Sequence, residues 1–338
     1  MPALLPLPAG EGWGEGTVAL VAIAALGLAM LIDIFLGEPP ARWHPVVWIG
    51  RYLGWAGQRT APRSDSDGGM GPRNLKSFWA GAFHWLAGAV VVMVLAWCWQ
   101  HLALRLPAVG AACLIGLALK PMLAWRMLRD EVLAVEAALG TSLAAGRAQL
   151  GRLVSRDVHQ LDTAAVRESA IESLAENLND SVVAPIFWFV LFGLPGAALY
   201  RFANTADAMW GYRGVRGGRV WEWAGKWAAR ADDVLSWLPA RLTGLLIMAL
   251  AGEVGRKGWS RLRTEAARTP SPNSGWPMAA MALALDVKLS KKDVYGLNAA
   301  GRSPAPEDTR QAVALCRRVV LAHVLLSMSA MILIVTVG

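Results

Sequence analysis

The stretch that decides the fold covers residues 166–200 and reads VRESAIESLAENLNDSVVAPIFWFVLFGLPGAALY. In its first half Glu168, Glu172, Glu176 and Asp180 recur every fourth residue, so a helix would carry four carboxylates on one stripe. The second half is strongly apolar. Like charges at this spacing cost about 0.2–0.5 kcal/mol per pair, and the low dielectric at a membrane edge enlarges that cost. The stripe therefore predicts a cationic partner, most simply Mg²⁺ carried in with phosphate.

A solvated acidic face is the alternative interpretation of this stripe, because charge runs commonly form such faces. Ala170, Leu174 and Leu178 would then pack on the opposite side of the helix. Three arginines close in sequence offer some neutralisation, namely Arg152, Arg156 and Arg167. The residues alone leave both interpretations open.

The composition of the whole chain agrees with a membrane protein. Its 338 residues are 55% hydrophobic and 17% charged, with 17 Trp, and its mean hydropathy is positive at +0.38. This is too apolar for an ordinary soluble protein of the same size. The three cysteines are scattered singly, which indicates neither a disulfide framework nor a thiolate metal site. We expect an all-α integral membrane protein.

We expect one membrane domain over residues 17–338, preceded by an unstructured extension over residues 1–16. Segments of about 20 apolar residues can span a bilayer. Four segments meet this criterion, at residues 17–36, 78–99, 109–125 and 319–337, and a shorter fifth at residues 238–251 is a partial or full span. Basic residues gather in the loop after the first span, so the large helical loops are predicted to face the cytoplasm.

Residues 182–200 are long enough to cross the membrane, but Gly193, Pro195 and Gly196 interrupt the middle of the segment. Pro and Gly at this density break a helix or fold it back. A full crossing would also place the following basic loop outside. We therefore predict a re-entrant hairpin, with a full span as the alternative.

A second oxygen-rich group, Asn204 and Asp207, follows this hairpin. Folding the hairpin back would bring the pair near Glu176, Asn177 and Asp180, where amide and carboxylate oxygens could share a Mg²⁺ shell with water and phosphate. The alternative is that Asn204 caps a helix that begins there.

Further along the chain, Arg230 can form a plain ion pair with Asp232 or Asp233. Arg241 differs because it begins an apolar stretch, where a buried guanidinium needs an anion unless it reaches the membrane surface. The turn Ser271-Pro272-Asn273-Ser274-Gly275-Trp276-Pro277 can present amides to an anion or can simply cap a helix.

Taken together, these motifs resemble the adenosylcobinamide-phosphate synthase family of cobalamin biosynthesis, the CobD/CbiB family, from about Ala19 to the carboxyl terminus. The matching residues are Asp33 with Gly37-Glu38-Pro39, His44-Pro45-Val46 with Gly50, Gly151-Arg152-Leu153-Val154 with Arg156-Asp157, Glu172-Ser173 with Glu176-Asn177, Asp180 and Ala184-Pro185, Asn204-Thr205 with Asp207, Met209 and Gly211-Tyr212, Ala229-Arg230 with Asp232-Asp233, Trp237, Pro239-Ala240-Arg241-Leu242-Thr243, and Ser271-Pro272-Asn273 with Gly275-Trp276-Pro277. The chain departs from the family pattern at Glu38, where the family has Asp, and at Asp286, where it has Gly.

The resemblance implies an amide ligase that joins a propionate carboxylate of adenosylcobyric acid to aminopropanol phosphate or a related amino alcohol, with ATP and Mg²⁺. It further implies a multi-pass protein of the bacterial inner membrane whose active site faces the cytoplasm, with contacts to other late cobalamin-pathway enzymes and none to nucleic acid. Carboxylates must be activated before they condense with amines, usually by phosphoryl transfer, which requires Mg²⁺.

Site roles follow from this chemistry. The metal candidates are Glu172, Glu176, Asp180 and Asp207. The proton-acceptor candidates are Asp157, Asp232 and Asp233, among which the sequence does not choose. The candidates for binding substrate or phosphate are His44, Arg156, Asn177, Asn204, Tyr212, Arg230, Arg241, Ser271 and Asn273.

Two rival functions use the same kinds of residues. A membrane prenyltransferase also holds Mg²⁺ diphosphate on Asn/Asp motifs, although such enzymes usually contain more full spans. A transporter would place its ionisable residues on broken helices at the bilayer midplane, whereas most acids here are expected in loops or at helix ends.

Overall fold

The computed structural model describes residues 14–64 and 74–337, and the chain divides into two compact units. The first unit consists of Met1–Leu123, Pro185–Leu235 and Met328–Gly338, and the second of Ala124–Ala184 and Ser236–Ser327. The sequence predicted one membrane domain over residues 17–338, and this division into two units was not expected. The first 13 residues of the predicted extension lie outside the described residues. Helix α1 begins at Glu15, within the segment expected to be unstructured.

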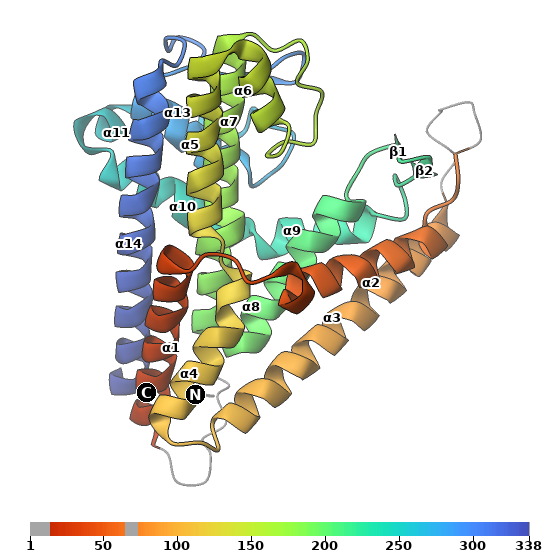
Figure 1. The fold of residues 1–338 in the computed structure, drawn as a ribbon, viewed down its shortest axis with the longest axis vertical. Helices are drawn as coiled ribbons and strands as arrows, with labels where there is room; N and C mark the ends of the chain where they lie inside the picture. The colour runs from red at the N-terminus through yellow and green to blue at the C-terminus, as the bar shows by residue number, and fades with distance from the viewer. Residues whose placement is uncertain (1–13, 65–73, 338) are drawn as a thin grey trace. The chain divides into compact units, whose positions relative to one another are not determined.

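The first unit is built from helices joined by short turns (Figure 1). Its elements are α1 (Glu15–Phe35), η1 (Ala41–Trp43), α2 (Pro45–Thr60), α3 (Leu75–Ala103), α4 (Ala108–Leu119), η2 (Lys120–Met122), nearly all of α8 (Ala184–Trp210), the β1–β2 hairpin (Val215–Arg216 and Arg219–Val220), α9 (Lys226–Leu235) and the end of α14. Helices α1 and α4 pack along each other, and α2 runs beside α3.

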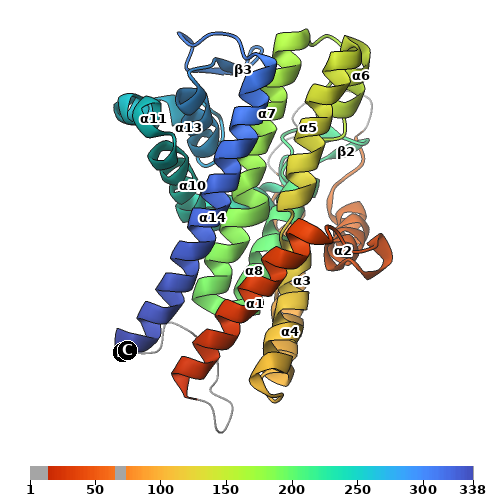
Figure 2. The same cartoon turned by 60° about the vertical axis from the view of Figure 1, so that its left-hand side comes forward.

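The second unit contains several long helices and a group of shorter helices (Figure 2). Its elements are α5 (Trp125–Thr141), α6 (Leu143–Leu150), α7 (Thr163–Leu178), the π-helical turn η3 (Asn179–Val183), α10 (Trp237–Leu250), α11 (Gly252–Gly258), η4 (Trp259–Arg261), α12 (Leu262–Ala266), α13 (Gly275–Leu285), the β3–β4 hairpin (Leu289–Lys291 and Tyr295–Leu297) and most of α14 (Pro306–Val337). Helix α7 packs against α5 and α13, and β3 lies against α7.

The predicted helical membrane fold is confirmed. Five helical stretches are long and apolar enough to cross a bilayer: Gly16–Phe35, Leu75–Ala103, Ala108–Thr141, Thr163–Trp210 and Pro306–Thr336. Helices α9 and α10, bent by 48° at a short break, form a further candidate that includes the predicted segment 238–251. The expected span over residues 109–125 is not one continuous helix, because α4 ends at Leu119 and η2 follows.

Helix α8 is broken within the segment 182–200, where a fold-back was predicted, while the re-entrant course through a membrane stays a prediction. Gly193 has φ 64° and ψ −154°, a conformation outside the helical region, and it interrupts the helix. Beyond it, a Cβ atom at Gly196 would collide with the carbonyl oxygen of Trp188. Residues eight apart in a straight helix would be separated by about 12 Å. The chain therefore reverses sharply at Gly193, where Gln100 accepts a hydrogen bond from the Leu194 amide at 2.8 Å.

The core of the first unit forms where α2, α3 and α8 meet. Phe202, Trp210 and Leu53 are fully or almost fully buried there, and the Trp210 indole donates to the Leu53 carbonyl at 3.1 Å. Gly88 of α3 faces Tyr52 and Phe202 so closely that any side chain at this position would collide with both rings. Close packing of aromatic residues therefore fixes α3 against its neighbours.

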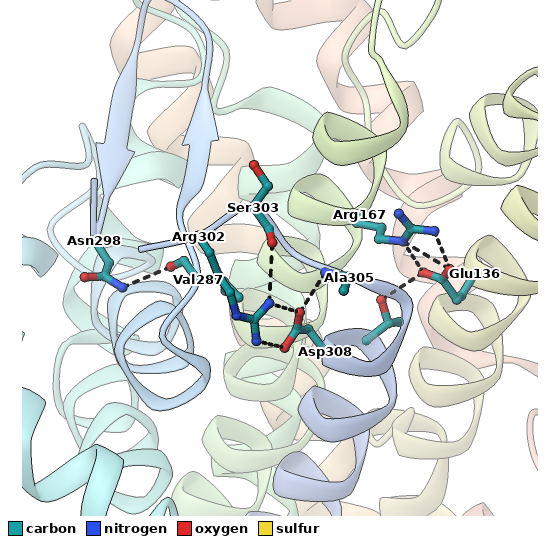
Figure 3. Close-up of polar contacts among 9 residues, drawn as sticks. Glu136, Arg167, Val287, Asn298, Arg302, Ser303, Ala305 and Asp308 are labelled. Atoms are coloured by element: carbon teal, nitrogen blue, oxygen red, sulfur yellow. Dashed lines mark hydrogen bonds and ion pairs between the residues drawn. The ribbon is translucent and has the colours of Figure 1, made fainter. Parts of the chain in front are cut away.

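Polar clamps hold the second unit together (Figure 3). Arg167 of α7 forms a forked pair with Glu136 of α5 at 2.8–3.1 Å, and Thr309 of α14 donates to the same carboxylate at 3.1 Å. Arg302 forms a second forked pair with Asp308 at 2.6 and 2.7 Å. These clamps join α5, α7 and α14, and they secure the segment that carries the β3–β4 hairpin.

Candidate functional site

The acidic stripe lies on α7 and η3 and is largely buried. Glu168 is 6% exposed and Glu172 is 4% exposed, whereas Glu176 and Asp180 are partly exposed. The apolar residues expected on the opposite face are buried as well. The alternative of a solvated acidic face is therefore wrong for Glu168 and Glu172, which are covered by protein.

Only one of the three nearby arginines neutralises the stripe. Arg156 approaches Glu172 Oε2 at 3.0 Å and also donates to the Ser169 hydroxyl. Arg167 pairs with Glu136 instead, and Arg152 pairs with Glu131 at 2.9 Å. Of these three arginines, Arg156 is therefore the one that contacts the stripe.

Glu172 is the least satisfied member of the stripe. Its Oε1 atom is buried and accepts no hydrogen bond from the described residues, and the Arg156 Nε atom is likewise unsatisfied. The Tyr295 hydroxyl lies near this carboxylate without completing a hydrogen bond to Oε1. Buried polar atoms are nearly always paired in native proteins, so an open carboxylate oxygen indicates a site for a ligand.

The β3–β4 hairpin covers the stripe and adds two residues that the sequence analysis missed. Ser290 donates to Glu168 Oε2 at 2.6 Å. Burial, followed by the charges of Glu172 and Glu176, raises the pKa of Tyr295, so its hydroxyl stays protonated and can act as a donor. Nothing in the local sequence marks these residues, because the hairpin lies more than a hundred residues from α7.

The π-helical turn η3 begins immediately after α7 and holds Asp180. Such turns widen the helix, and they are frequent at functional sites. Asn179 donates to Asp180 at 2.8 Å and accepts from Thr243 of α10 at 3.1 Å. The Val183 carbonyl at the end of the turn accepts a hydrogen bond from the His323 ring at 3.1 Å. The turn therefore links the end of the acidic stripe to α10.

Arg241 of α10 lies against the turn that precedes α13. The Arg241 guanidinium lies over the Trp237 ring at 4.1 Å and the Trp276 ring at 5.0 Å. It donates to Asn273 Oδ1 at 3.1 Å and to the Trp237 carbonyl at 2.6 Å. Aromatic faces and amide oxygens thus hold this cation in place.

Ser271 acts as a cap in this turn. Its hydroxyl accepts from the Asn273 and Ser274 amides, both at 3.2 Å, just before α13 begins. The capping alternative for this turn is therefore correct for Ser271. Asn177 similarly bonds within its own helix, donating to the Ser173 carbonyl at 2.9 Å.

The remaining oxygen-rich pair, Asn204 and Asp207, lies inside α8 in the first unit. Asn204 therefore does not cap a helix, because it lies inside the helical segment that resumes after Gly193. Asp207 occupies the space beside Gly211, where any side chain would collide with its carboxylate. Since Glu176 and Asp180 belong to the second unit, the shared Mg²⁺ shell stays a prediction.

The other predicted residues of the first unit are distributed over separate positions. Tyr212 donates to the Ala208 carbonyl at 2.8 Å, and Arg216 covers its ring. Arg230 is exposed on α9, and Asp232 and Asp233 are partly buried on the same helix. In the second unit Asp157 is exposed, and its carboxylate accepts from the His159 amide at 2.9 Å. That contact is a turn of the kind that aspartate commonly forms.

A second buried charge cluster lies in the first unit around Lys120. The Lys120 ammonium is 3.3 Å from Asp33 and 2.8 Å from Glu38, and His44 contacts Glu38 at 3.0 Å. Burial alone would raise the pKa of Glu38, but the hydrogen bonds from His44 and Lys120 hold it below its ordinary value. His44 also caps α2 by accepting from the Val46 amide. Lys120 lies within the predicted span 109–125, and its partners Asp33 and Glu38 are distant from it in the chain.

The donor set of the acidic stripe suits a hard cation that is held partly by its own ligands. Among the residues that the structure describes, no three His, Cys, Asp or Glu side chains form a cage that could hold a metal ion. Mg²⁺ commonly needs only one or two carboxylates, together with water and phosphate oxygens. The open oxygen of Glu172 fits that mode of binding, and it does not fit an ion coordinated entirely by protein.

Comparison with known sequences identifies relatives over most of the chain. A family model described as CobD/Cbib protein matches residues 26–320. The chain is 40% identical over 298 residues to "Probable cobalamin biosynthesis protein CobD" of Pyrococcus abyssi, covering 88% of this chain and 92% of the relative. It is 37% identical to "Cobalamin biosynthesis protein CobD" of Brucella anthropi, covering 85% and 90%, and 38% identical to that of Chromobacterium violaceum, covering 91% and 96%. No solved structure matches the chain.

Proposed function

Because the chain belongs to the CobD/Cbib family of cobalamin biosynthesis proteins, we propose that it catalyses the ATP- and Mg²⁺-dependent amide ligation of adenosylcobyric acid with aminopropanol phosphate or a related amino alcohol. We further propose that it works in the bacterial inner membrane with its active site facing the cytoplasm. The observation that carries the proposal is the acidic stripe on α7, where the buried Glu172 Oε1 atom accepts no hydrogen bond from the described residues.

The proposed reaction has two steps. A propionate carboxylate of the corrinoid first attacks the γ-phosphorus of ATP, which forms an acyl phosphate and releases ADP. The amine nitrogen then attacks the acyl carbon, forms the C–N bond, loses a proton and expels inorganic phosphate. Mg²⁺ bound at the stripe would neutralise phosphate charge during these steps.

Residues of the second unit are assigned to this chemistry by their contacts. Glu172 would contribute the principal carboxylate oxygen to the metal, with Glu176 and Asp180 holding its water or phosphate ligands. Arg156 is held against Glu172, and it would limit the negative charge of the stripe until phosphate arrives. Arg241 would bind a phosphate or a carboxylate, because its planar fork is fixed between Trp237 and Trp276.

The proton released by the amine needs an acceptor, and the three candidates differ in their surroundings. Asp157 is exposed and already accepts a backbone hydrogen bond. Asp232 and Asp233 are partly buried on α9. Because partial burial makes a carboxylate a better base than full exposure does, Asp157 is the weakest of the three candidates.

The two rival functions are less well supported. The family match extends over residues 26–320 with relatives named for cobalamin biosynthesis, which favours neither a prenyltransferase nor a transporter. The acids of α7 are also held by Arg156 and Ser290 inside one unit. That arrangement suits a fixed site for chemistry better than a pathway for ions.

The test is a defined reaction followed by mass spectrometry. Purified protein in detergent is mixed with adenosylcobyric acid, aminopropanol phosphate, ATP and Mg²⁺, and the mass of the corrinoid product is measured. The expected mass gain is that of the amine minus water, accompanied by ADP. Conversion of labelled polyprenyl diphosphate with no change of the corrinoid would instead favour prenyl transfer. An unchanged corrinoid across all amines would refute the ligase proposal.

A further inference from the structure

The first unit contains a cavity of about 1070 Å³ between its helices. The cavity is walled by α2, α3, α4, the second half of α8 and the loop that follows α1. Pockets for small ligands usually measure about 300–1,000 Å³, so this one can accept a large molecule. Because α3 and α4 lie within candidate membrane spans, much of its wall belongs to the apolar layer of the protein.

The side chains that line this cavity are nearly all hydrocarbon or aromatic. Val91 and Leu95 of α3 and Leu117 of α4 line it, and each is more than half exposed. They continue the apolar outer faces of the two helices into the cavity. Trp43 and Trp48 lie at its loop side and are also exposed. Tryptophan is enriched at the boundary between membrane and water.

Most of the uncharged polar side chains of the lining bond within the protein. The Tyr52 hydroxyl donates to the His84 carbonyl at 2.7 Å. The Trp48 and Trp99 indoles donate to the carbonyls of Arg42 and Leu114, at 3.1 and 3.0 Å. These donors are therefore not available to a ligand.

Three charged residues line the cavity, and they too have partners. Glu38 and Lys120 form an ion pair with each other, and Asp33 and His44 complete that cluster. Arg201 also has an interaction partner within the protein. A ligand rich in amides or phosphates would lose its hydrogen bonds to water on entering, with few replacements. A hydrocarbon chain would lose none.

We propose that this cavity holds a hydrocarbon chain of a membrane phospholipid, which enters from the bilayer between α3 and α4. An apolar space of this volume would otherwise leave its walls without packing partners. The polar substrates of the ligase are accordingly bound elsewhere. The proposal does not depend on the ligase activity, since it follows from the lining alone.

Lipid retention by the intact protein tests this proposal directly. The protein is reconstituted in vesicles of phosphatidylethanolamine and phosphatidylglycerol, extracted in mild detergent and examined by native mass spectrometry. We expect at least one retained phospholipid mass per chain. The double variant Ala96→Trp/Ala118→Trp fills the cavity from α3 and α4 and should lose this mass by at least about tenfold, whereas Val94→Trp, an exposed position outside the lining, should keep it.

Photolabelling provides a second measurement that needs no variant. With a phospholipid that carries a diazirine on its acyl chain, we expect crosslinks on peptides containing Val92 and Ala96, which line the cavity and are less exposed than Val94. Retention of the lipid mass by the filled variant, crosslinks confined to outward residues, or adducts of detergent mass alone would each overturn the proposal. One-for-one displacement of the lipid by adenosylcobyric acid would overturn it as well, by making the cavity a substrate site.

Discussion

Two of the buried charge clusters of this protein are constructed differently. In the first unit Lys120 lies between Asp33 and Glu38, with His44 on the outer side of Glu38. In the second unit Glu168, Glu172, Glu176 and Asp180 follow one another along α7 and η3, and Arg156 contacts Glu172. The first cluster brings its own cation into contact with both carboxylates, because Asp33 Oδ1 and Glu38 Oε1 both lie against the Lys120 ammonium. In the second cluster the Glu172 Oε1 atom is buried and accepts no hydrogen bond from the described residues.

This difference separates a structural role from a binding role. A buried ion pair loses much stability when one partner is removed, but it has little reason to bind anything further. A buried row of like charges is unfavourable until a cation arrives, so its cost is offset only in the bound state. We therefore expect substitutions in the first cluster to reduce stability and substitutions in the second to reduce activity.

The largest effect is expected for Lys120→Met, which removes the cation and leaves Asp33 and Glu38 buried without it. Breaking a buried pair in this way costs about 3–5 kcal/mol. Thermal unfolding in detergent, followed by tryptophan fluorescence, should show a large decrease in Tm. The exposed Lys76→Met provides the control, and the additional changes Asp33→Asn and Glu38→Gln should restore part of the loss. A decrease no larger than that of the control would show that the first cluster is not structural.

Glu172→Gln should produce the opposite pattern. Loss of the carboxylate that we assign to Mg²⁺ should reduce kcat/KM for ligation at least about 100-fold, by analogy with the removal of a group that stabilises transition-state charge. The Tm should change little, because the weakened contact with Arg156 is offset by the removal of one repulsive charge, and a glutamine oxygen can still accept from Arg156. The exposed Glu253→Gln is the matched control. Full activity together with a lower Tm would assign Glu172 to the structural class instead.

Tyr295→Phe sharpens the comparison within the second unit. Its hydroxyl is held in the protonated form near Glu172, so we expect a loss of about tenfold in kcat/KM, equal to about 1.4 kcal/mol, and a higher KM for Mg²⁺. Tyr212→Phe removes a hydroxyl that donates to the Ala208 carbonyl in the first unit. Equal effects of the two substitutions on the KM for Mg²⁺ would contradict the assignment of Tyr295 to the metal site.

The pH dependence of stability should report the first cluster. Since the folded state holds the pKa of Glu38 below its ordinary value of 4.5, its ionised form stabilises the fold above that pH. This stabilisation should be lost as the pH falls from 4.5 through the lower folded pKa. The Tm of the wild type should therefore decrease over this interval by more than that of Glu38→Gln. Parallel curves for the two proteins would exclude the contribution of Glu38.

The smallest effect is expected for Asp157→Asn. The side chain is exposed, and an asparagine oxygen can still accept from the His159 amide. We expect a change of less than about threefold in kcat/KM, which is within the range of a minor structural adjustment. A loss of a hundredfold in the same ligation assay would instead identify Asp157 as the proton acceptor and remove Asp232 and Asp233 from consideration.

The sequence predicted those features that depend on neighbours along the chain. Apolar length predicted the membrane helices, and four-residue spacing placed the acids of α7 on one stripe. The cluster of Gly193, Pro195 and Gly196 predicted the reversal within α8. Each of these features is set within one or two helical turns, where geometry follows directly from residue order.

The tertiary structure alone decided which charges meet. The sequence placed Arg152, Arg156 and Arg167 near the acidic stripe, but only Arg156 reaches it, because the other two turn toward Glu131 and Glu136 on α5. It gave no sign that Ser290 would contact Glu168 or that Lys120 would join Asp33. Such partners are distant in the chain, and burial of the apolar faces of the helices determines which polar side chains are brought together.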